Sequence, residues 1–310
     1  MLFRLLLLVA AACYYAAYRL HHRTCLRPGK PLAHASLFVI GSFRIGGAGK
    51  TPFTAWLAQF ILENARCAAT DASSPDAAGN DSATGNKDAA PRIAILCHSK
   101  AADEAEMLRQ KFAGKPQVRV IATPNRYHTA HELDSDFDYI ICDDGFEDTR
   151  LAGATTIRLD RDGTPQRIAD LVPAGKNRSL LQDHDAPALV LGPSDIEFRI
   201  AQVTNAAGQP CPVNPVAICG IGDSARFASD LNAFGIFPAK FIARPDHDRH
   251  FEQTFRKLLE QGGPLVTTEK DLARLPRELR VHRSVFVAYQ QVSLSDTAIN
   301  GVRQAIASRR

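Results

Sequence analysis

Three short stretches of the sequence carry residues whose types and spacing suit the chemistry of phosphate groups. The first is GSFRIGGAGKTP at residues 41–52, which lies between an apolar run and a helix-like segment. In such a strand–loop–helix turn, backbone N–H groups cradle phosphates, the lysine neutralises them and the hydroxyl binds Mg²⁺. Arg44 replaces the first glycine of the usual eight-residue pattern, so a glycine-rich turn with a chance Lys-Thr pair is the alternative. The candidate nucleotide-binding residues are Gly46, Gly47, Ala48, Gly49, Lys50 and Thr51.

The second stretch is DYIICDDG at residues 138–145, an apolar run that ends in two adjacent carboxylates. An acidic strand end is the usual companion of a phosphate loop, because its carboxylate holds the magnesium ion or a water bound to it. We therefore predict that Asp143 or Asp144 holds the magnesium ion, or a water bound to it, in a triphosphate site that includes Thr51. An acidic turn after a strand is the alternative interpretation.

Acid–base groups form the third set. Asp103 and Glu104 open the helix-like stretch DEAEMLRQKF, and PDHDRH places His247 between two aspartates. A hydroxyl that attacks a γ-phosphate benefits from a positioned carboxylate or imidazole that accepts its proton. Taken alone, each of these stretches is also explained as a capped helix start or a surface cluster. TTEKD at residues 267–271 is interpreted as a strand-to-helix turn with capping carboxylates.

Short apolar runs that alternate with helical stretches must position these groups. Continuous apolar runs separated by helices favour parallel strands that are buried on both faces. We therefore predict an α/β fold, with a P-loop NTPase-like domain built on a mostly parallel sheet. The expected strands are 37–40, 92–97, 118–122, 139–142, 154–159, 188–191, 215–219, 238–242, 265–268 and 284–289.

The chain has 310 residues, which is enough for two compact domains with separate cores. Residues 192–212 shift to turn residues before a new apolar strand, so we expect a P-loop kinase domain at 29–200 and a smaller α/β domain at 201–310. Residues 67–91 contain no large apolar side chain. We interpret them as a flexible insertion, with a lid over the nucleotide as the alternative.

Residues 1–28 are predicted to form a membrane-associated helix. The sequence stays apolar from Leu5 to Ala17, and a basic cluster follows. A helix over residues 2–18 extends only about 25 Å, short of the roughly 30 Å hydrocarbon core, so it is marginal as a span. Tyrosines 14, 15 and 18 favour a helix that inserts partly and anchors at the headgroup level. A secretory signal is the competing interpretation, because the run Ala-Ala-Ala-Cys ends at Cys13.

Composition narrows the classes of partner. The formal charge of +4 is mild, and no basic stripe interleaved with aromatic residues is visible, so no nucleic-acid partner is indicated. Seven cysteines occur without a CxxC pair of metal-site spacing. We interpret them mainly as small core residues in a reducing compartment.

The order and spacing of these stretches together resemble the tetraacyldisaccharide 4′-kinases of lipid A synthesis. GSFRIGGAGKTP is similar to the family's GN-x-x-x-GG-x-GKTP, DEAEMLRQKF to its DEP-type helix start and IICDDGFED to its DDG-L-Q-H. LVPAGKNRSLL resembles LPAGPLRE-x-L, and GIGDSARF resembles GIG-x-P-x-RF. PDHDRH resembles PDHH, and VTTEKDLARL contains TEKD. The resemblance covers about residues 37–275, and the N-terminal apolar helix also fits the family.

The resemblance implies an enzyme that transfers the γ-phosphate of ATP to the 4′-hydroxyl of an acylated glucosamine disaccharide, a tetraacyldisaccharide 1-phosphate. Two α/β domains would close around the nucleotide at the cytoplasmic face of the bacterial inner membrane. ATP and Mg²⁺ are the implied cofactors, and no protein partner is implied. In family terms, Lys50 is the loop lysine, Thr51 supplies the magnesium hydroxyl, and Asp143 and Asp144 are the acidic metal pair.

The same resemblance assigns further roles. Asp103 matches an aspartate that works with a histidine, here His247, to activate the sugar hydroxyl. Glu104 and Arg178 match further active-site positions, which we interpret as substrate-binding.

The chain also departs from the family pattern. CHSKAADEAEM replaces the family's longer SRGYGR-like segment, and Ser42, Ser179 and Glu147-Asp148 stand for asparagine, glutamate and glutamine-histidine. Two other functions therefore stay open: a nucleotide-binding membrane protein that has lost catalysis, and a P-loop kinase of a different glycolipid or small molecule.

Overall fold

A computed structural model of the chain describes residues 2–71, 90–160, 163–246 and 248–308. His247 and most of the predicted insertion at residues 67–91 lie outside the described residues. We expected the insertion to begin at residue 67, but helix α2 (Lys50–Asp71) continues to residue 71, so that start is wrong.

The first lobe contains a sheet whose six strands are all parallel. Their order is β3 (Val118–Thr123), β2 (Ile93–His98), β4 (Tyr139–Cys142), β1 (Ser36–Gly41), β5 (Thr155–Leu159) and β6 (Leu189–Leu191). Residues Phe38 and Ile40 of β1 pack in a core with α2 and α3 (Ala102–Lys111), while Leu37 and Val39 face a second core with α4 (Arg126–Glu132). Burial on both faces explains why these strands are continuous apolar runs.

The second lobe contains a five-stranded sheet. Its order is β7 (Ile196–Thr204), β11 (Val285–Leu294), β10 (Leu265–Thr268), β8 (Val216–Cys219) and β9 (Lys240–Ala243), and only the β7–β11 pair is antiparallel in the described residues. The predicted fold class is thus confirmed, with two α/β units and an N-terminal apolar helix. The helices of this lobe are α5 (Ser224–Ala233), α6 (Phe251–Glu260), α7 (Glu269–Ala273) and α8 (Arg277–Arg280).

Strand β7 corrects the interpretation of residues 192–212 as a turn-rich boundary. Ile196, Phe198 and Ile200 are buried, while Glu197 and Arg199 between them are exposed. This period-two alternation is the mark of an antiparallel strand with one buried face. A search for continuous apolar runs therefore overlooks it.

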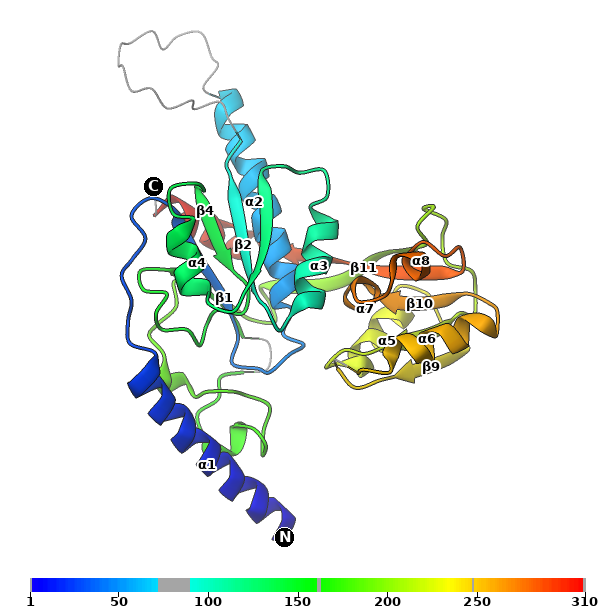
Figure 1. Cartoon of the computed structure of the whole chain (residues 1–310), viewed down its shortest axis with the longest axis horizontal. Coiled ribbons are helices and arrows are strands. Elements are labelled where there is room, and N and C mark those ends of the chain that lie inside the picture. Colours follow the sequence, from blue (N-terminus) through cyan, green and yellow to red (C-terminus); the bar gives the residue numbers. More distant parts are fainter. Residues whose placement is uncertain (1, 72–89, 161–162, 247, 309–310) are drawn as a thin grey trace.

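The long strands β7 and β11 join the two lobes (Figure 1). Phe198 of β7 and Val292 of β11 lie in the core of the first lobe, together with Ala298 and Val302 of the last helix, α9 (Asp296–Ala307). The chain therefore returns to the first lobe after completing the second sheet. The domain boundary at residues 200/201 stays a prediction. Helix α9 follows this boundary in the sequence but packs in the core of the first lobe.

Helix α1 (Leu2–Cys25) projects from the first lobe (Figure 1). It has 24 residues and is about 36 Å long, because it continues beyond the apolar residues 2–18, for which we expected about 25 Å. By length and composition it could cross a membrane, and 6% of its most apolar window is buried against the rest of the chain. Two short 3₁₀ turns, Ile168–Asp170 and Leu181–Asp183, flank the segment on which α1 docks.

Candidate nucleotide and phosphoryl-transfer site

The candidate phosphate loop connects the end of β1 at Gly41 to the start of α2 at Lys50. Gly46, Gly47 and Gly49 have φ angles of 69°, 68° and 85°. Side chains disfavour this left-handed region, so the three glycines allow the loop to curl tightly in front of α2. The N-terminus of α2 thus faces the space enclosed by the loop, as a phosphate cradle requires.

The segment around Arg178 pairs with the candidate phosphate loop. The Ile45 amide donates to the Lys176 carbonyl at 2.9 Å, and the Arg178 amide donates to the Phe43 carbonyl at 2.8 Å. These bonds bring the Arg178 guanidinium to 3.0 Å from Asp144 Oδ2. Two stretches more than a hundred positions apart therefore supply cations to the same site.

Asp144 follows β4 and gathers three cations. Its Oδ1 lies 3.3 Å from Lys50 Nζ, and Arg126 NH1 donates to its carbonyl at 2.8 Å and to that of Asp143 at 2.7 Å. Burial acts to raise the pKa of Asp144, but Lys50, Arg178 and Arg126 outweigh it and lower the pKa. Its φ of 54° is costly for a residue with a side chain, by about 1–3 kcal/mol. Such strain is typical of functional sites.

Asp143 is the more deeply buried carboxylate of the pair. Its Oδ1 accepts a hydrogen bond from Thr54 Oγ1 at 2.9 Å, whereas its Oδ2 makes no hydrogen bond within the described part of the chain. Burial, and then the charge of Glu104, raise the pKa of Asp143 to about 7. A buried acceptor without a donor is costly, and a bound cation would satisfy it.

The residues present fit a magnesium ion. No group of three or more His, Cys, Asp or Glu side chains suited to a metal occurs among the described residues. Mg²⁺ is usually held by only one or two carboxylates, with waters and substrate phosphates completing its shell. Asp143 Oδ2 and the Thr51 hydroxyl suit that role better than Asp144, because both Asp144 oxygens already contact cations.

The loop opens into a cavity of about 580 Å³ between the two lobes. Its walls include the loop glycines, Lys50 and Arg178 on one side and Asp223, Arg226 and Lys270 on the other. A larger cavity of about 650 Å³, between α2, α3 and β11, contains Trp56 and Phe60 but none of the loop glycines. We therefore assign the candidate site to the first cavity, whose size suits a nucleotide.

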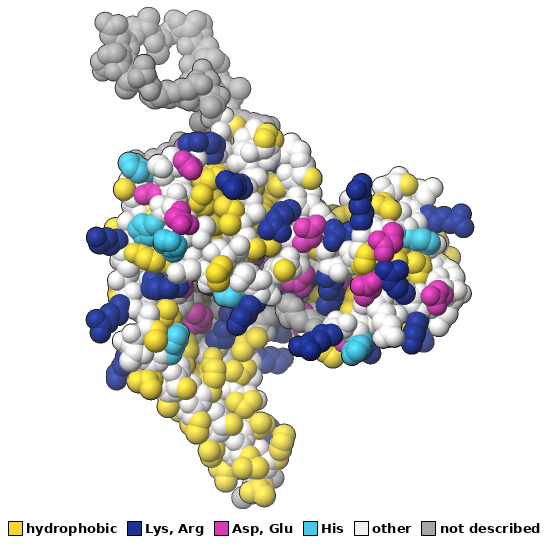
Figure 2. Space-filling view, in the orientation of Figure 1, with side chains coloured by type: hydrophobic (Ala, Val, Ile, Leu, Met, Phe, Trp, Pro, Cys, Tyr) yellow, Lys and Arg dark blue, Asp and Glu magenta, His cyan; other side chains and the backbone are white. Residues whose placement is uncertain are grey.

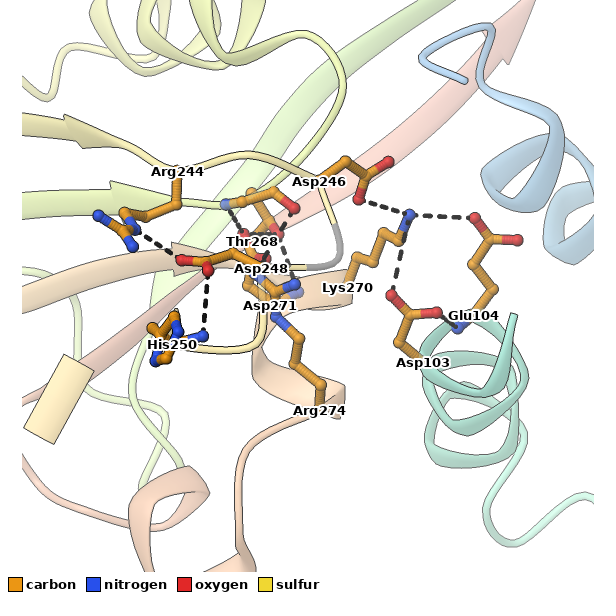
Figure 3. A network of polar contacts seen from close by, with 11 residues as sticks. Asp103, Glu104, Arg244, Asp246, Asp248, His250, Thr268, Lys270, Asp271 and Arg274 are labelled. Atoms are coloured by element: carbon orange, nitrogen blue, oxygen red, sulfur yellow. Dashed lines mark hydrogen bonds and ion pairs between the residues drawn. The ribbon is translucent and has the colours of Figure 1, made fainter. Parts of the chain in front are cut away.

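Lys270 connects the two lobes across this cavity (Figure 3). Its Nζ lies 3.2 Å from Glu104 Oε1 and 3.8 Å from Asp103 Oδ2, both on α3. It also lies 3.3 Å from Asp246 Oδ1 of the second lobe. Burial acts to lower the pKa of Lys270, but the charges of these three carboxylates outweigh it and raise the pKa. Sequence reasoning missed Lys270 and Asp246 as site residues, although both lie in stretches that matched the family pattern.

The predicted pair of Asp103 and His247 is described in part. Asp103 is nearly buried at the start of α3 and faces Lys270 (Figure 3), while His247 lies outside the described residues. The neighbouring Asp248 is bound by Arg244 Nε at 2.6 Å instead of facing α3. The joint role of Asp103 and His247 stays a prediction.

Helix α1 docks on the first lobe through the tyrosines that we had expected at the lipid headgroups. Tyr14 donates to the Arg178 carbonyl at 2.9 Å, Tyr15 to Asp183 Oδ1 at 2.9 Å and Tyr18 to Glu147 Oε2 at 2.6 Å. That expectation is wrong for these side chains, because they face protein. Their spacing is also the one-sided pattern of a docked helix.

Two departures from the family pattern contact each other. Ser179 Oγ donates to Glu147 Oε1 at 2.8 Å, and Ser179 is completely buried. Ser179, which stands where the family motif has glutamate, is therefore hydrogen-bonded to a carboxylate of the loop after β4. In the altered segment, His98 at the end of β2 and Lys100 after it line the candidate cavity.

The comparisons with known proteins agree along almost the whole chain. A family model described as tetraacyldisaccharide-1-P 4′-kinase matches residues 3–308. The tetraacyldisaccharide 4′-kinase of Parvibaculum lavamentivorans is 30% identical over 265 residues, with 78% of this chain and 74% of that protein covered. The protein of the same name from Blochmanniella pennsylvanica is 26% identical, with 77% and 73% covered.

A solved structure shows the same fold. It is the LpxK protein of Aquifex aeolicus, described as the apo form in complex with ATP, with a TM-score of 0.66 and 21% identity. The match covers 99% of both chains. The family resemblance expected from the motifs is thus confirmed.

Proposed function

The chain belongs to the tetraacyldisaccharide-1-P 4′-kinase family, and on that premise we propose that it transfers the γ-phosphate of ATP to the 4′-hydroxyl of a tetraacyldisaccharide 1-phosphate in lipid A synthesis. The observation that carries the proposal is the buried Asp143, whose Oδ2 meets no hydrogen-bond partner of ordinary geometry in the described chain and whose carboxyl group lies near enough to the Thr51 hydroxyl for that hydroxyl to lower its pKa. A site built in this way favours a bound cation and a phosphate together.

Charge neutralisation and positioning supply most of the rate in phosphoryl transfer. Lys50 and Arg178 each face Asp144 from a different stretch of chain, and both line the cavity. In our proposal they turn toward the phosphates of ATP, while the loop amides bind the same phosphates. Asp143 and Thr51 would hold Mg²⁺, which supplies further neutralisation of the phosphate charge when bound.

The acceptor hydroxyl needs a group that takes its proton. Asp103 lies at the start of α3, opposite the second lobe, and its contact with Lys270 keeps it beside the cavity. We assign it the role of general base, assisted by His247. Glu104 and Arg178 would contact the substrates.

The acceptor is amphiphilic, so we propose that the protein works at the inner membrane surface, on the cytoplasmic face where ATP is present. The first half of α1 supports this location, because it is covered with exposed apolar side chains (Figure 2). These include Leu2, Phe3, Leu5, Leu6 and Val9. An apolar helix surface of this kind favours contact with lipid.

The test is an assay of the purified full-length chain with γ-labelled ATP and the disaccharide 1-phosphate lipid in detergent micelles. We expect label on the lipid at the 4′ position, and we expect Asp103→Ala and His247→Ala to lower turnover by at least a hundredfold. ATP binding without label transfer would contradict the kinase assignment and favour a protein that has lost catalysis. Membrane partition that is unchanged after removal of residues 1–22, together with no label on the lipid, would favour a kinase of a soluble small molecule.

A further inference from the structure

We propose that α1 is a positioning element of the phosphate site, in addition to any role as an anchor. In this proposal Tyr14 and Tyr18 hold residues 178 and 179 in place, and these hold the cation arrangement around Asp144. This inference rests on the proposed kinase function, because its main test measures kcat for phosphorylation of the lipid.

A continuous set of contacts runs from α1 to the candidate phosphate loop. Tyr14 donates its hydroxyl to the Arg178 carbonyl at 2.9 Å. The Arg178 guanidinium is 3.0 Å from Asp144 Oδ2, and Asp144 Oδ1 is 3.3 Å from Lys50 Nζ. Three contacts therefore separate the tyrosine from the loop lysine.

A second set of contacts fixes the residue after Arg178. Tyr18 donates to Glu147 Oε2 at 2.6 Å, and Glu147 Oε1 accepts from Ser179 Oγ at 2.8 Å. His184 Nε2 also lies 2.8 Å from that hydroxyl. The backbone at Arg178 is thus held at its carbonyl by Tyr14 and, one residue later, by a buried side chain that depends on Tyr18.

The two halves of α1 differ in their surroundings. Ala11 is fully buried against Leu171 and Leu180, and Tyr14 packs beside the same cluster. The residues before it, from Leu2 to Val9, are mostly exposed and apolar. One half is therefore free to meet lipid while the other is part of the wall behind Arg178. A rigid helix transmits the position of one half to the other.

Removal of the two hydroxyls should leave the Arg178 carbonyl and Glu147 Oε2 without these donors, while the aromatic packing stays. The hydroxyl of Tyr15 offers a matched comparison, because it lies on the same helix and contacts Asp183 but makes no hydrogen bond to Arg178 or Glu147. Each Tyr→Phe change also retains most of the side-chain volume, so folding should be preserved.

The experiment compares full-length Tyr14→Phe/Tyr18→Phe with Tyr15→Phe. We expect kcat of the double variant to fall about 5- to 50-fold, which corresponds to two hydrogen bonds of ordinary net strength. KM for the lipid and flotation with vesicles of anionic phospholipid should stay as in the parent. Tyr15→Phe should change kcat less than twofold.

Several results would overturn the inference. An equal loss of kcat in Tyr15→Phe would show that helix docking in general matters, and a loss of flotation in parallel with kcat would show an anchor role alone. Single Tyr14→Phe and Tyr18→Phe variants serve if the double variant does not fold, and an unchanged kcat in both would also reject the proposal.

Failure of the proposed function is distinguishable from failure of the inference. If the parent chain does not phosphorylate the lipid, the positioning role is judged by the affinity for Mg·ATP, measured with a fluorescent ATP analogue. Weaker binding in the double variant, but not in Tyr15→Phe, supports the positioning role. Equal affinity in all three proteins rejects it.

Discussion

Two buried aspartates, one in each lobe, show how similar local structure serves different ends. Asp143 follows β4 of the first sheet, and Asp271 lies in α7 directly after β10 of the second. Both are buried, and burial is the largest cause that raises the pKa of each. Each therefore sits where a charged carboxylate costs free energy.

The difference lies in their hydrogen bonds. Asp271 Oδ2 accepts from the Gly220 amide at 3.0 Å and from Thr268 Oγ1 at 2.8 Å, and its Oδ1 is bound by Arg274 (Figure 3). Asp143 has a partner for Oδ1 and none for Oδ2 within the described residues. A satisfied buried carboxylate holds a fold together, whereas an unsatisfied one is a candidate for binding something else.

The largest expected effect comes from Lys50, the cation that pairs with Asp144 beside the unsatisfied Asp143. Lys50→Ala removes the loop lysine, and we expect kcat for lipid phosphorylation to fall by about 10²–10³ or more, because charge neutralisation at the phosphates is lost. Thermal unfolding should change little. Lys111→Ala is the matched control, since Lys111 pairs with Glu269 outside the phosphate loop. Full activity of Lys50→Ala would place the nucleotide elsewhere.

Alanine at each aspartate tests the comparison directly. Asp143→Ala should lower kcat by at least about a hundredfold, while the free energy of unfolding should change by less than about 2 kcal/mol, because removal of an unpaired buried acceptor offsets the lost hydrogen bond from Thr54. Asp271→Ala should cost about 3–5 kcal/mol of unfolding free energy, because Arg274 loses its partner in the interior. Urea unfolding and steady-state kinetics measure both. If Asp143→Ala instead lowered stability and Asp271→Ala lowered kcat alone, our assignment of a binding role to Asp143 and a structural role to Asp271 would be wrong.

Lys270 differs from both aspartates, because it belongs to the second lobe but pairs with carboxylates of the first lobe. Lys270→Met removes the cation between Glu104, Asp103 and Asp246, and we expect kcat to fall about tenfold as these carboxylates separate. A lysine whose pKa is raised above 10.5 stays charged at lower pH, so its contribution to stability is complete below that value and is lost only at higher pH. The stability difference between the variant and the parent should therefore be constant from pH 7 to 9, and a difference that changed across this range would contradict the assignment.

The smallest expected effect concerns Arg44, which replaces the first glycine of the usual loop pattern. Its NH2 lies 3.3 Å from Asp223 Oδ2 in the second lobe, and both side chains are partly exposed. Pairs of this kind contribute about 0.2–1 kcal/mol and are screened by salt. Arg44→Gln should change KM for ATP less than fivefold, and the change should shrink in 0.5 M NaCl. A double-mutant cycle with Asp223→Asn measures the coupling energy between Arg44 and Asp223. A coupling energy that does not depend on salt would argue against an exposed ion pair.

Much of the framework was predictable because its signals are local. Continuous apolar runs indicated the parallel strands, and the glycines before Lys50 indicated a tight loop, in which the structure gives three of them left-handed φ angles. The two aspartates after an apolar run indicated the acidic edge of the same site. Strand β7 was missed, because its burial alternates and its partner β11 lies about ninety residues later.

The sequence by itself determined the glycine-rich loop before Lys50, the two aspartates at a strand end and the parallel strands, because each depends on neighbouring residues and on burial. Only the tertiary structure decided that Lys270 meets Glu104, that Arg178 meets Asp144 and that Tyr14 meets Arg178 at a separation of 164 positions. Such contacts depend on which surfaces dock, and docking is settled by the packing of whole lobes and helices. The same tyrosine spacing suits a lipid interface or a protein surface, and the choice between them is not a local property.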